Sequence, residues 1–365
     1  MKILLRLLLK NQHPRNRSGQ AQTDKGMTLV ELLVGAIMAF LIITPMLAFV
    51  VDMLNTDRRE QVKSNTEQDI QAAVDFIAQD LSQAIYIYDN NPATVSTATT
   101  TATGIPALLA GNFIPPPDAT KAPILVFWKR QLIKNAVPVN ATLTPKPSDC
   151  KPGELAGKAG ECNDTYVLSL VAYYQLKDQQ NTWCQPSGGT CPTRIARYEI
   201  RDGVKNPNPS SSDPANPYYT VDPTEAAAPN KAFNKEFDIS KPTEKVTMGS
   251  TQFINPEVLV NYIDHSPKQL DVAECKNALG TPKIQIGLAA PTDVPEDTLK
   301  VTDSASTTIT NSFYACVDNA RNLARVTIRG NSLRRLQTDA GYDAKKAAYF
   351  PTVSVQVQGL GARGK

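Results

Sequence analysis

The sequence predicts an α+β fold in which a long amino-terminal helix packs on a largely antiparallel β-sheet head. Two patterns predict it. Residues 27–88 are first apolar and then amphipathic with helical spacing, and residues 89–365 contain a series of short strand-like runs. The chain has 365 residues, of which 41% are hydrophobic, so it contains enough apolar surface for a substantial core.

Residues 1–26 form a basic leader. They carry a formal charge of +5, whereas the remaining chain carries −2. Overall charge therefore does not indicate a nucleic-acid-binding surface. An ordinary secretory signal is not expected either, because the apolar run from Ile3 to Leu9 is short and interrupted by Arg6.

The segment from Leu32 to Val51 predicts a membrane-spanning helix. Its twenty consecutive uncharged residues are long enough, as a helix, to cross a hydrocarbon layer of about 30 Å. A buried core helix is the alternative, although globular helices seldom stay apolar on every face for this length. The basic leader should remain cytoplasmic, so we expect a single pass through the inner (cytoplasmic) membrane and an extracytoplasmic head. Pro45 removes one backbone hydrogen bond within the run, which predicts a kink or a local opening of the helix.

Beyond Asp52 the helix is expected to continue with an amphipathic character. Five apolar residues at helical spacing form one stripe: Ile70, Val74, Ile77, Leu81 and Ile85. The opposite face is polar: Gln68, Asp69, Gln71, Asp75, Gln79 and Asp80. Asn90, Asn91 and Pro92 then end the pattern. We therefore expect one helix, or two nearly continuous ones, over residues 27–88, with the second half packed on the head. A membrane anchor followed by an unrelated coil is the alternative.

The head is expected to span residues 89–365. Residues 91–122 are rich in Thr, Ala and Pro, which is typical of a surface loop, and the Pro-rich stretch at 206–229 predicts a long insertion. Most of the strand-like runs are bounded by Gly, Pro, Asn or Asp. These runs are Ile124–Trp128, Tyr166–Tyr174, Ile195–Arg201, Val258–Ile263, Lys283–Leu288, Ser312–Val317, Ala324–Arg329 and Thr352–Val357.

All six cysteines lie beyond the apolar segment: Cys150, Cys162, Cys184, Cys191, Cys275 and Cys316. An even number in the part predicted to be extracytoplasmic favours disulfides, with buried free thiols as the alternative. The short loop around Gly188 and Gly189 suggests that Cys184 pairs with Cys191. Cys150 with Cys162 and Cys275 with Cys316 would complete the set, one of fifteen complete pairings. No cysteine pair has C-x-x-C spacing and the chain has two histidines, so no metal site is expected.

No catalytic residue or cofactor is expected, and the chain is not predicted to be an enzyme. The run Gly359–Gly364 fits G-x-G-x-x-G but ends the chain, which predicts a flexible tail. His265 beside Asp264 is a weak acid/base pair, because adjacent strand residues point to opposite faces. Asp293, Glu296 and Asp297 are interpreted as a solvated loop rather than a Ca²⁺ site.

A more specific pattern surrounds the start of the apolar helix. The run reads Asp24-Lys25-Gly26-Met27-Thr28-Leu29-Val30-Glu31-Leu32-Leu33-Val34. It resembles the type III signal of type IV prepilins and type II secretion pseudopilins, with glycine before the cut and glutamate at the fifth position after it. The resemblance implies that a prepilin peptidase cleaves between Gly26 and Met27, removes the leader and N-methylates Met27. Many members of the family have phenylalanine where this chain has Met27.

Glu31 is the most informative residue of that run. A carboxylate at the centre of a bilayer costs roughly 2.5–3.5 kcal/mol, and less near the interface. As an acid in the first turn it would be favoured by the helix dipole by about 0.3–1 kcal/mol. The resemblance adds a second role, in which Thr28 and Glu31 serve filament assembly and Glu31 pairs with the new amino terminus of a neighbouring subunit.

Similarity also extends to the larger minor pilins and pseudopilins, the PilW and type II secretion J classes. It rests on Gln71–Leu81 in the helix, on Phe313–Asp318 and on Arg325–Asn331. Within these classes the chain is most similar to the pseudopilins of cyanobacterial hormogonium polysaccharide secretion.

The resemblance implies a minor subunit that assembles into or primes a type IV pilus-like filament, for polysaccharide secretion or surface motility. Its implied partners are prepilin peptidase, other pilins or pseudopilins and the inner-membrane assembly platform. It would be found in the inner membrane or in an extracellular or periplasmic filament. The alternative is a membrane-anchored extracellular protein whose head recognises polysaccharide or another ligand. Cleavage separates the two, because an anchor does not need a free amino terminus at Met27.

Overall fold

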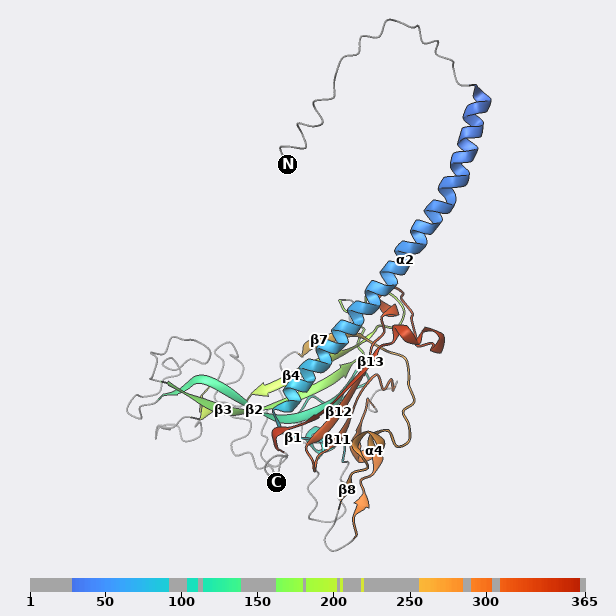
Figure 1. Cartoon of the computed structure of the whole chain (residues 1–365). Coiled ribbons are helices and arrows are strands. Elements are labelled where there is room, and N and C mark those ends of the chain that lie inside the picture. The colour runs from blue at the N-terminus through green and yellow to red at the C-terminus, as the bar shows by residue number, and fades with distance from the viewer. Residues whose placement is uncertain are drawn as a thin grey trace, which may run out of the picture. The chain divides into compact units, whose positions relative to one another are not determined.

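The computed structural model describes residues 28–91, 104–110, 114–138, 162–179, 182–201, 204–205, 218–219, 256–284, 290–303 and 309–361. The chain divides into two compact units, Met1–Asp57 and Arg58–Lys365. The second unit contains two antiparallel sheets and the carboxyl half of one long helix (Figure 1).

That helix, α2, runs without interruption from Leu29 to Ser82. It contains the predicted apolar and amphipathic segments, but it ends before the expected boundary at residue 88. Ala84–Ile87 form strand β1, which pairs antiparallel with β2 (Lys121–Pro138). The helical spacing of Ile85 was therefore misleading, because pairing with a strand about forty residues later determines the local structure.

The larger sheet has five strands in the order β1-β2-β3-β4-β7, and all neighbours are antiparallel. The remaining strands of this sheet are β3 (Cys162–Leu176), β4 (Thr193–Arg201) and β7 (Glu257–Ile263). The second sheet has four strands in the order β10-β11-β12-β13, also antiparallel. These are Lys300–Val301, Phe313–Asp318, Leu323–Arg329 and Thr352–Gln358.

Shorter elements lie between these strands along the chain. Two small ladders pair β5 (Val204–Lys205) with β6 (Tyr218–Tyr219), and β8 (Lys283–Ile284) with β9 (Thr292–Asp293). The short helices are α3 (Ile105–Ala110), α4 (Glu274–Leu279), α5 (Glu296–Leu299), η2 (Leu333–Arg335) and η3 (Ala344–Tyr349).

Six of the eight predicted strand runs fall within observed strands, and Ser312–Val317 begins one residue before β11. These strands confirm the α+β class and the largely antiparallel sheet. For the run at 283–288, only β8 is described, because residues 285–289 lie outside the described part of the chain. The predicted insertion at 206–229 also lies outside it, apart from Tyr218–Tyr219 of β6.

The main core lies between the carboxyl half of α2 and the two sheets. It contains Ile70, Val74, Ile77 and Leu81 from the predicted helical stripe, together with residues of β1–β4, β7 and β10–β12. A second cluster joins α4, α5 and β11 around Cys275 and Cys316. Burial of the stripe confirms that the amphipathic half of α2 packs on the head.

The end of the chain is held against its first strand. The N–H of Gly359 donates to the carbonyl of Asn322 at 2.9 Å, and Nδ2 of Asn322 donates to the carbonyl of Ala84 at 3.0 Å. A Cβ on Gly361 would lie 2.0 Å from the carbonyl oxygen of Ile85. The expectation of a flexible tail is therefore wrong for residues 359–361, and residues 362–365 lie outside the described part.

Candidate functional site

The amino end of α2 is capped by Thr28. The N–H of Glu31 contacts Oγ1 of Thr28 at 3.3 Å and the Thr28 carbonyl oxygen at 3.0 Å. Thr28 and Glu31 thus occupy the first and fourth positions of a capping-box sequence, which satisfies donors that a helix start otherwise leaves unpaired. The predicted cleavage site, Gly26 and Met27, lies outside the described residues.

The apolar half of α2 is exposed along its whole length. Every large apolar side chain from Leu29 to Leu54 keeps about half or more of its surface accessible, from 83% at Leu29 to 49% at Val50. Among the described residues, α2 alone is long and apolar enough to cross a membrane, a statement about its length and composition only. None of its most apolar window is buried, so this segment is not a core helix of the described head.

Pro45 lies inside α2, and the helix continues on both sides of it. One residue earlier, the hydroxyl of Thr44 donates to the carbonyl of Phe40 at 2.8 Å. Such back-bonding by threonine accompanies helix bends. The helix is thus not interrupted at Pro45, and the predicted kink remains a prediction.

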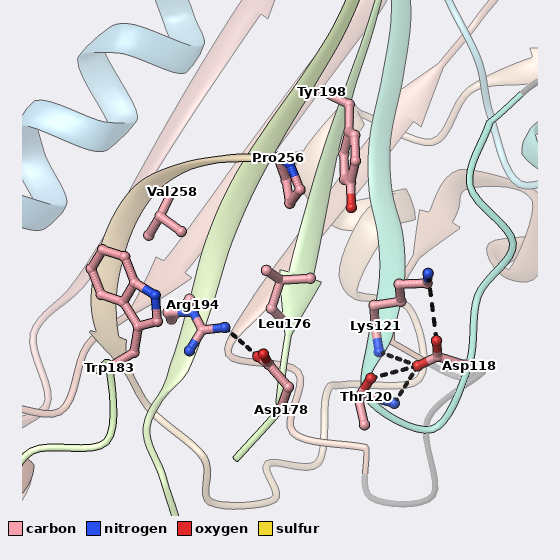
Figure 2. Close-up of a pocket in the computed structure, with 10 residues that line it drawn as sticks. All are labelled: Asp118, Thr120, Lys121, Leu176, Asp178, Trp183, Arg194, Tyr198, Pro256 and Val258. Carbon is pink, nitrogen blue, oxygen red and sulfur yellow. Dashed lines mark hydrogen bonds and ion pairs between the residues drawn. The ribbon is translucent and has the colours of Figure 1, made fainter. Parts of the chain in front are cut away.

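A cleft of about 610 Å³ opens on the head beside β2, β3 and β4. In Figure 2, Trp183 and Arg194 lie on one side, Asp118, Thr120 and Lys121 lie on the other, and Leu176 and Asp178 lie between them. The remaining lining residues are Tyr198, Pro256 and Val258. Sequence reasoning missed this cleft, because its residues come from segments up to 140 positions apart that only the sheet brings together.

Both cations in the cleft are paired with carboxylates. Arg194 forms an ion pair with Asp178, and Nζ of Lys121 lies 3.5 Å from Asp118. Asp118 also accepts hydrogen bonds from the N–H and the hydroxyl of Thr120, at 2.7 and 2.6 Å. These Thr120 bonds outweigh partial burial and, with Lys121, hold the pKa of Asp118 below 3.8. Asp118 is therefore an ionised acceptor at neutral pH.

Tyr198 stays protonated beside these carboxylates. Burial raises the pKa of its hydroxyl, and the charges of Asp118 and Asp178 raise it further. Its ring packs edge-on against Tyr174, with centroids 4.9 Å apart. The cleft thus presents a fixed phenol that can donate a hydrogen bond.

The Trp183 side of the cleft is built on a short disulfide loop. Cys184, the next residue, is bonded to Cys191, and Nδ2 of Asn261 donates to the Trp183 carbonyl at 3.0 Å. The fully buried Arg334 crosses the loop and donates to the carbonyls of Pro186, Gly188 and Thr190, at 2.8 to 3.0 Å. These bonds fix the backbone that carries the indole.

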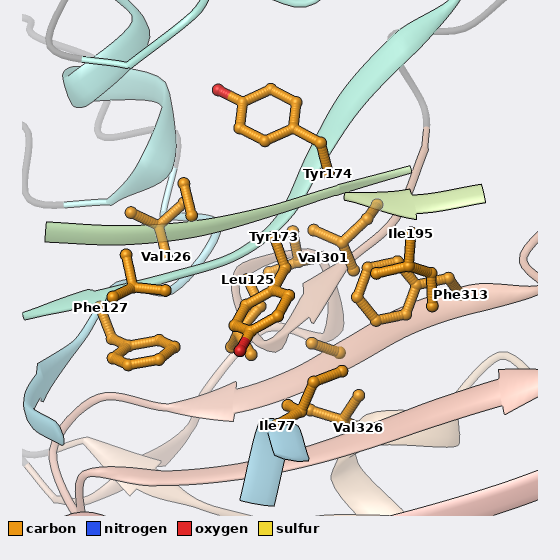
Figure 3. Close-up of a cluster of buried hydrophobic side chains, with 14 of the residues drawn as sticks. Ile77, Leu125, Val126, Phe127, Tyr173, Tyr174, Ile195, Val301, Phe313 and Val326 are labelled. Atoms are coloured by element: carbon orange, nitrogen blue, oxygen red, sulfur yellow. The ribbon is translucent and has the colours of Figure 1, made fainter. Parts of the chain in front are cut away.

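A buried polar network attaches α2 to the larger sheet. Asp80 accepts hydrogen bonds from Nζ of Lys129 at 2.9 Å, from the Tyr173 hydroxyl at 2.7 Å and from Nε of Arg197 at 2.8 Å. Glu199 completes the network, 2.7 Å from Arg197 and 3.3 Å from Lys129. The two carboxylates and the two cations of this network thus neutralise one another's charge in the interior. Figure 3 shows Ile77, one turn earlier on α2, with Val326 of β12 beside it and Tyr173 of β3 nearby.

Burial alone would raise the pKa of Asp80, but the hydrogen bond and charge of Arg197, with Tyr173 and Lys129, lower it below 3.8. Asp80 was expected on the polar, exposed face, and that expectation is wrong, because only 7% of the residue is exposed. A signal was present in the sequence. Asp80 follows Ala73 and Ile77 at helical spacing on the edge of the apolar stripe, and both of those residues are buried.

Close approach of α2 to the sheets depends on Gly330, just after β12. A Cβ at this position would lie 2.1 Å from Cδ1 of Ile70 and 3.1 Å from Cγ2 of Thr66. Both helix residues are fully buried. A side chain here would have to displace Ile70, so glycine favours the close approach of the helix.

Two of the predicted disulfides are present, Cys184–Cys191 and Cys275–Cys316. Cys162 is disulfide-bonded as well, and its predicted partner Cys150 lies outside the described residues. No described cysteine is free, which is contrary to the alternative of buried thiols.

The remaining candidates take structural roles. Asp264 pairs with Arg329 at 2.7 Å rather than with His265, and it accepts the N–H of Ser266 at 3.0 Å. Glu296 is not a solvated loop residue, because its carboxylate accepts the N–H groups of Cys275 and Lys276 at the start of α4. No cluster of three metal-ligating side chains occurs among the described residues.

Comparison of the chain with family models, with curated proteins and with solved structures finds no match.

Proposed function

We propose that this chain is a pilin-like subunit, cut between Gly26 and Met27, whose α2 inserts in the membrane and then assembles into a type IV pilus-like filament. The observation that carries the proposal is the division of α2. Its first half is apolar and exposed on every face, while its second half is part of the core of the head.

The exposed half needs a partner outside the chain. Contiguous apolar surface of this extent marks contact with lipid or with another protein. A bilayer and a bundle of like helices would both bury it, and the two roles follow one another in a subunit that leaves the membrane for a filament.

The start of α2 fits the same proposal. Glu31 is an exposed acid in the first turn of an otherwise apolar segment. In an apolar environment a carboxylate requires a compensating charge. Cleavage before Met27 would create an amine close to the first turn, and the amine of a neighbouring subunit could pair with Glu31. At about 4 Å such a pair gains on the order of 4 kcal/mol at an effective dielectric constant of 20, before desolvation.

Two variants in the native host test the proposal. Gly26→Leu should leave an uncut precursor in the membrane, as seen in the mass of the amino-terminal peptide. Glu31→Gln should be processed normally, with Met27 methylated, but should fail to enter or prime filaments. Glu60→Gln is the matched control, because Glu60 is an exposed acid on the same helix beyond the apolar segment. Normal processing of Gly26→Leu, or normal filament output from Glu31→Gln, would contradict the proposal.

A membrane-anchored binding protein is the second candidate, and the cleft beside β2, β3 and β4 favours it. That function needs the apolar half of α2 only as an anchor. It predicts that Glu31→Gln has no effect and that the leader remains attached. The same two variants therefore discriminate between the candidates.

A further inference from the structure

We propose that the cleft formed by Asp118, Thr120, Lys121, Leu176, Asp178, Trp183, Arg194, Tyr198, Pro256 and Val258 binds an uncharged saccharide chain. The proposal concerns the head alone. It does not require that α2 assembles into a filament, so either proposal can fail without the other.

The charges in the cleft indicate which ligands it accepts. Arg194 keeps 3% of its side chain exposed and its partner Asp178 keeps 26%, while Lys121 keeps 29% and Asp118 keeps 51%. In each pair the carboxylate is thus more accessible than the cation. A ligand meets fixed acceptor oxygens whose charge is already compensated. Hydroxyl groups suit such acceptors, whereas an anionic polymer would find both cations already paired.

Unpaired hydrogen-bond donors and apolar surface in the cleft indicate the remaining chemistry of the ligand. Neither the indole N–H of Trp183 nor the hydroxyl of Tyr198 makes a hydrogen bond in the described part of the chain. Leu176 and Val258 add apolar surface to the lining of the cleft. A pyranose ring combines an apolar C–H face with hydroxyls at its edge, so it matches a wall of this composition. The cleft is open and of the size usual for small-ligand sites, about 300–1,000 Å³.

The cleft is also preorganised. The backbone of Trp183 is fixed by the Cys184–Cys191 bond, by Asn261 and by the buried Arg334. Asp118 is held by Thr120 and Lys121 on a turn that begins β2. A rigid site loses little conformational entropy when a ligand binds. This matters for a flexible saccharide, because its individual contacts are weak.

Binding to the full chain in detergent micelles tests the proposal. The chain has two tryptophans, and Trp128 is fully buried with its indole N–H bonded to the Tyr88 hydroxyl at 2.8 Å. Ligand-induced changes in fluorescence therefore report on Trp183. We expect at least one of maltohexaose, cellohexaose and mannohexaose to change the emission with a dissociation constant in the millimolar range or below. Trp183→Ala should weaken that binding about tenfold or more, measured by calorimetry.

Two further variants separate stacking from nonspecific effects. Trp183→Phe keeps an aromatic face and should lose less affinity than Trp183→Ala. Tyr166→Ala is the matched control, because Tyr166 is 54% exposed on β3 and does not line the cleft. It should bind as wild type. Circular dichroism of each variant verifies folding.

Three outcomes would overturn the proposal. The first is that none of the three hexasaccharides binds at 10 mM, and the second is that Trp183→Ala binds the ligand as well as wild type. The third is that polygalacturonate or a lysine-rich peptide binds at this cleft while the neutral hexasaccharides do not. That last result would assign the cleft to a charged polymer or to a protein partner instead.

Discussion

The two halves of α2 belong to one uninterrupted helix but have opposite surroundings. From Leu29 to Leu54 every large apolar side chain is exposed. Between Thr66 and Leu81, seven residues are buried against the sheets, and one of them is the charged Asp80. The first half therefore contributes nothing to the packing of the described head, although it is the more apolar. The second half contributes both apolar burial and a polar network. Hydrophobicity alone does not reveal which part of a helix stabilises a fold, since the partner surface decides.

The largest effect should come from removing the buried acid of the second half. Asp80→Ala removes one of the two carboxylates that Lys129 and Arg197 share, so Glu199 alone faces two buried cations. Loss of one partner of a buried ion pair costs about 3–5 kcal/mol, so the free energy of unfolding of the head should fall by that amount. Urea unfolding followed by tryptophan fluorescence measures it. Asp75→Ala, an exposed acid on the same helix, should change it by less than about 0.5 kcal/mol. Equal effects of the two variants would refute the structural role of the network.

One substitution made in both halves tests the comparison directly. Leu81→Ala removes a side chain that is 0% exposed, and should destabilise the head by about 2–5 kcal/mol. Leu41→Ala removes one that is 62% exposed, and should leave head unfolding unchanged. Differential unfolding of the two variants in the same detergent is the measurement. A similar loss from Leu41→Ala would mean that the first half also stabilises the head.

A smaller effect is expected at Gly330, against which α2 packs. Gly330→Ala places a methyl group against Ile70, and overpacking of this kind costs about 1–3 kcal/mol. Ile70→Val removes Cδ1, the atom that would clash, so the double variant should recover part of the loss relative to the sum of the single variants. Gly35→Ala in the first half is the control, because a Cβ there meets nothing within 4 Å. Strict additivity of Gly330→Ala and Ile70→Val would show that the contact does not limit the packing.

The smallest expected effect is the pH dependence of the stability that Asp80 provides. The pKa of Asp80 is lowered in the folded head, so its contribution to stability is complete above pH of about 4 and is lost as the pH falls through the folded-state pKa. The difference in unfolding free energy between wild type and Asp80→Asn should therefore be constant from pH 5 to 7 and should shrink below pH 4. Acid titration of both proteins checks this, and using the difference removes the contribution of other titrating groups. A difference in unfolding free energy that grows below pH 4 would contradict this prediction.

Local pattern was enough to predict the strands and the helix, because alternation and spacing are visible in adjacent residues. It failed where a distant partner decides the outcome. Ile85 continues the helical spacing, yet it belongs to a strand paired with β2. Asp80 looks like a surface acid until Lys129 and Arg197, 49 and 117 residues later, are known to surround it. The cleft has no local signature at all, since Trp183 and Asp118 meet only through the sheet.

The contacts of Asn322 have a consequence for how the head can be handled. This one residue bonds Ala84, at the start of β1, and Gly359, just after the last strand. The strand that follows α2 and the segment that follows β13 are therefore held side by side. A tag attached beyond Gly361 therefore follows a segment that already lies against β1, outside the hydrogen-bonded strands of either sheet.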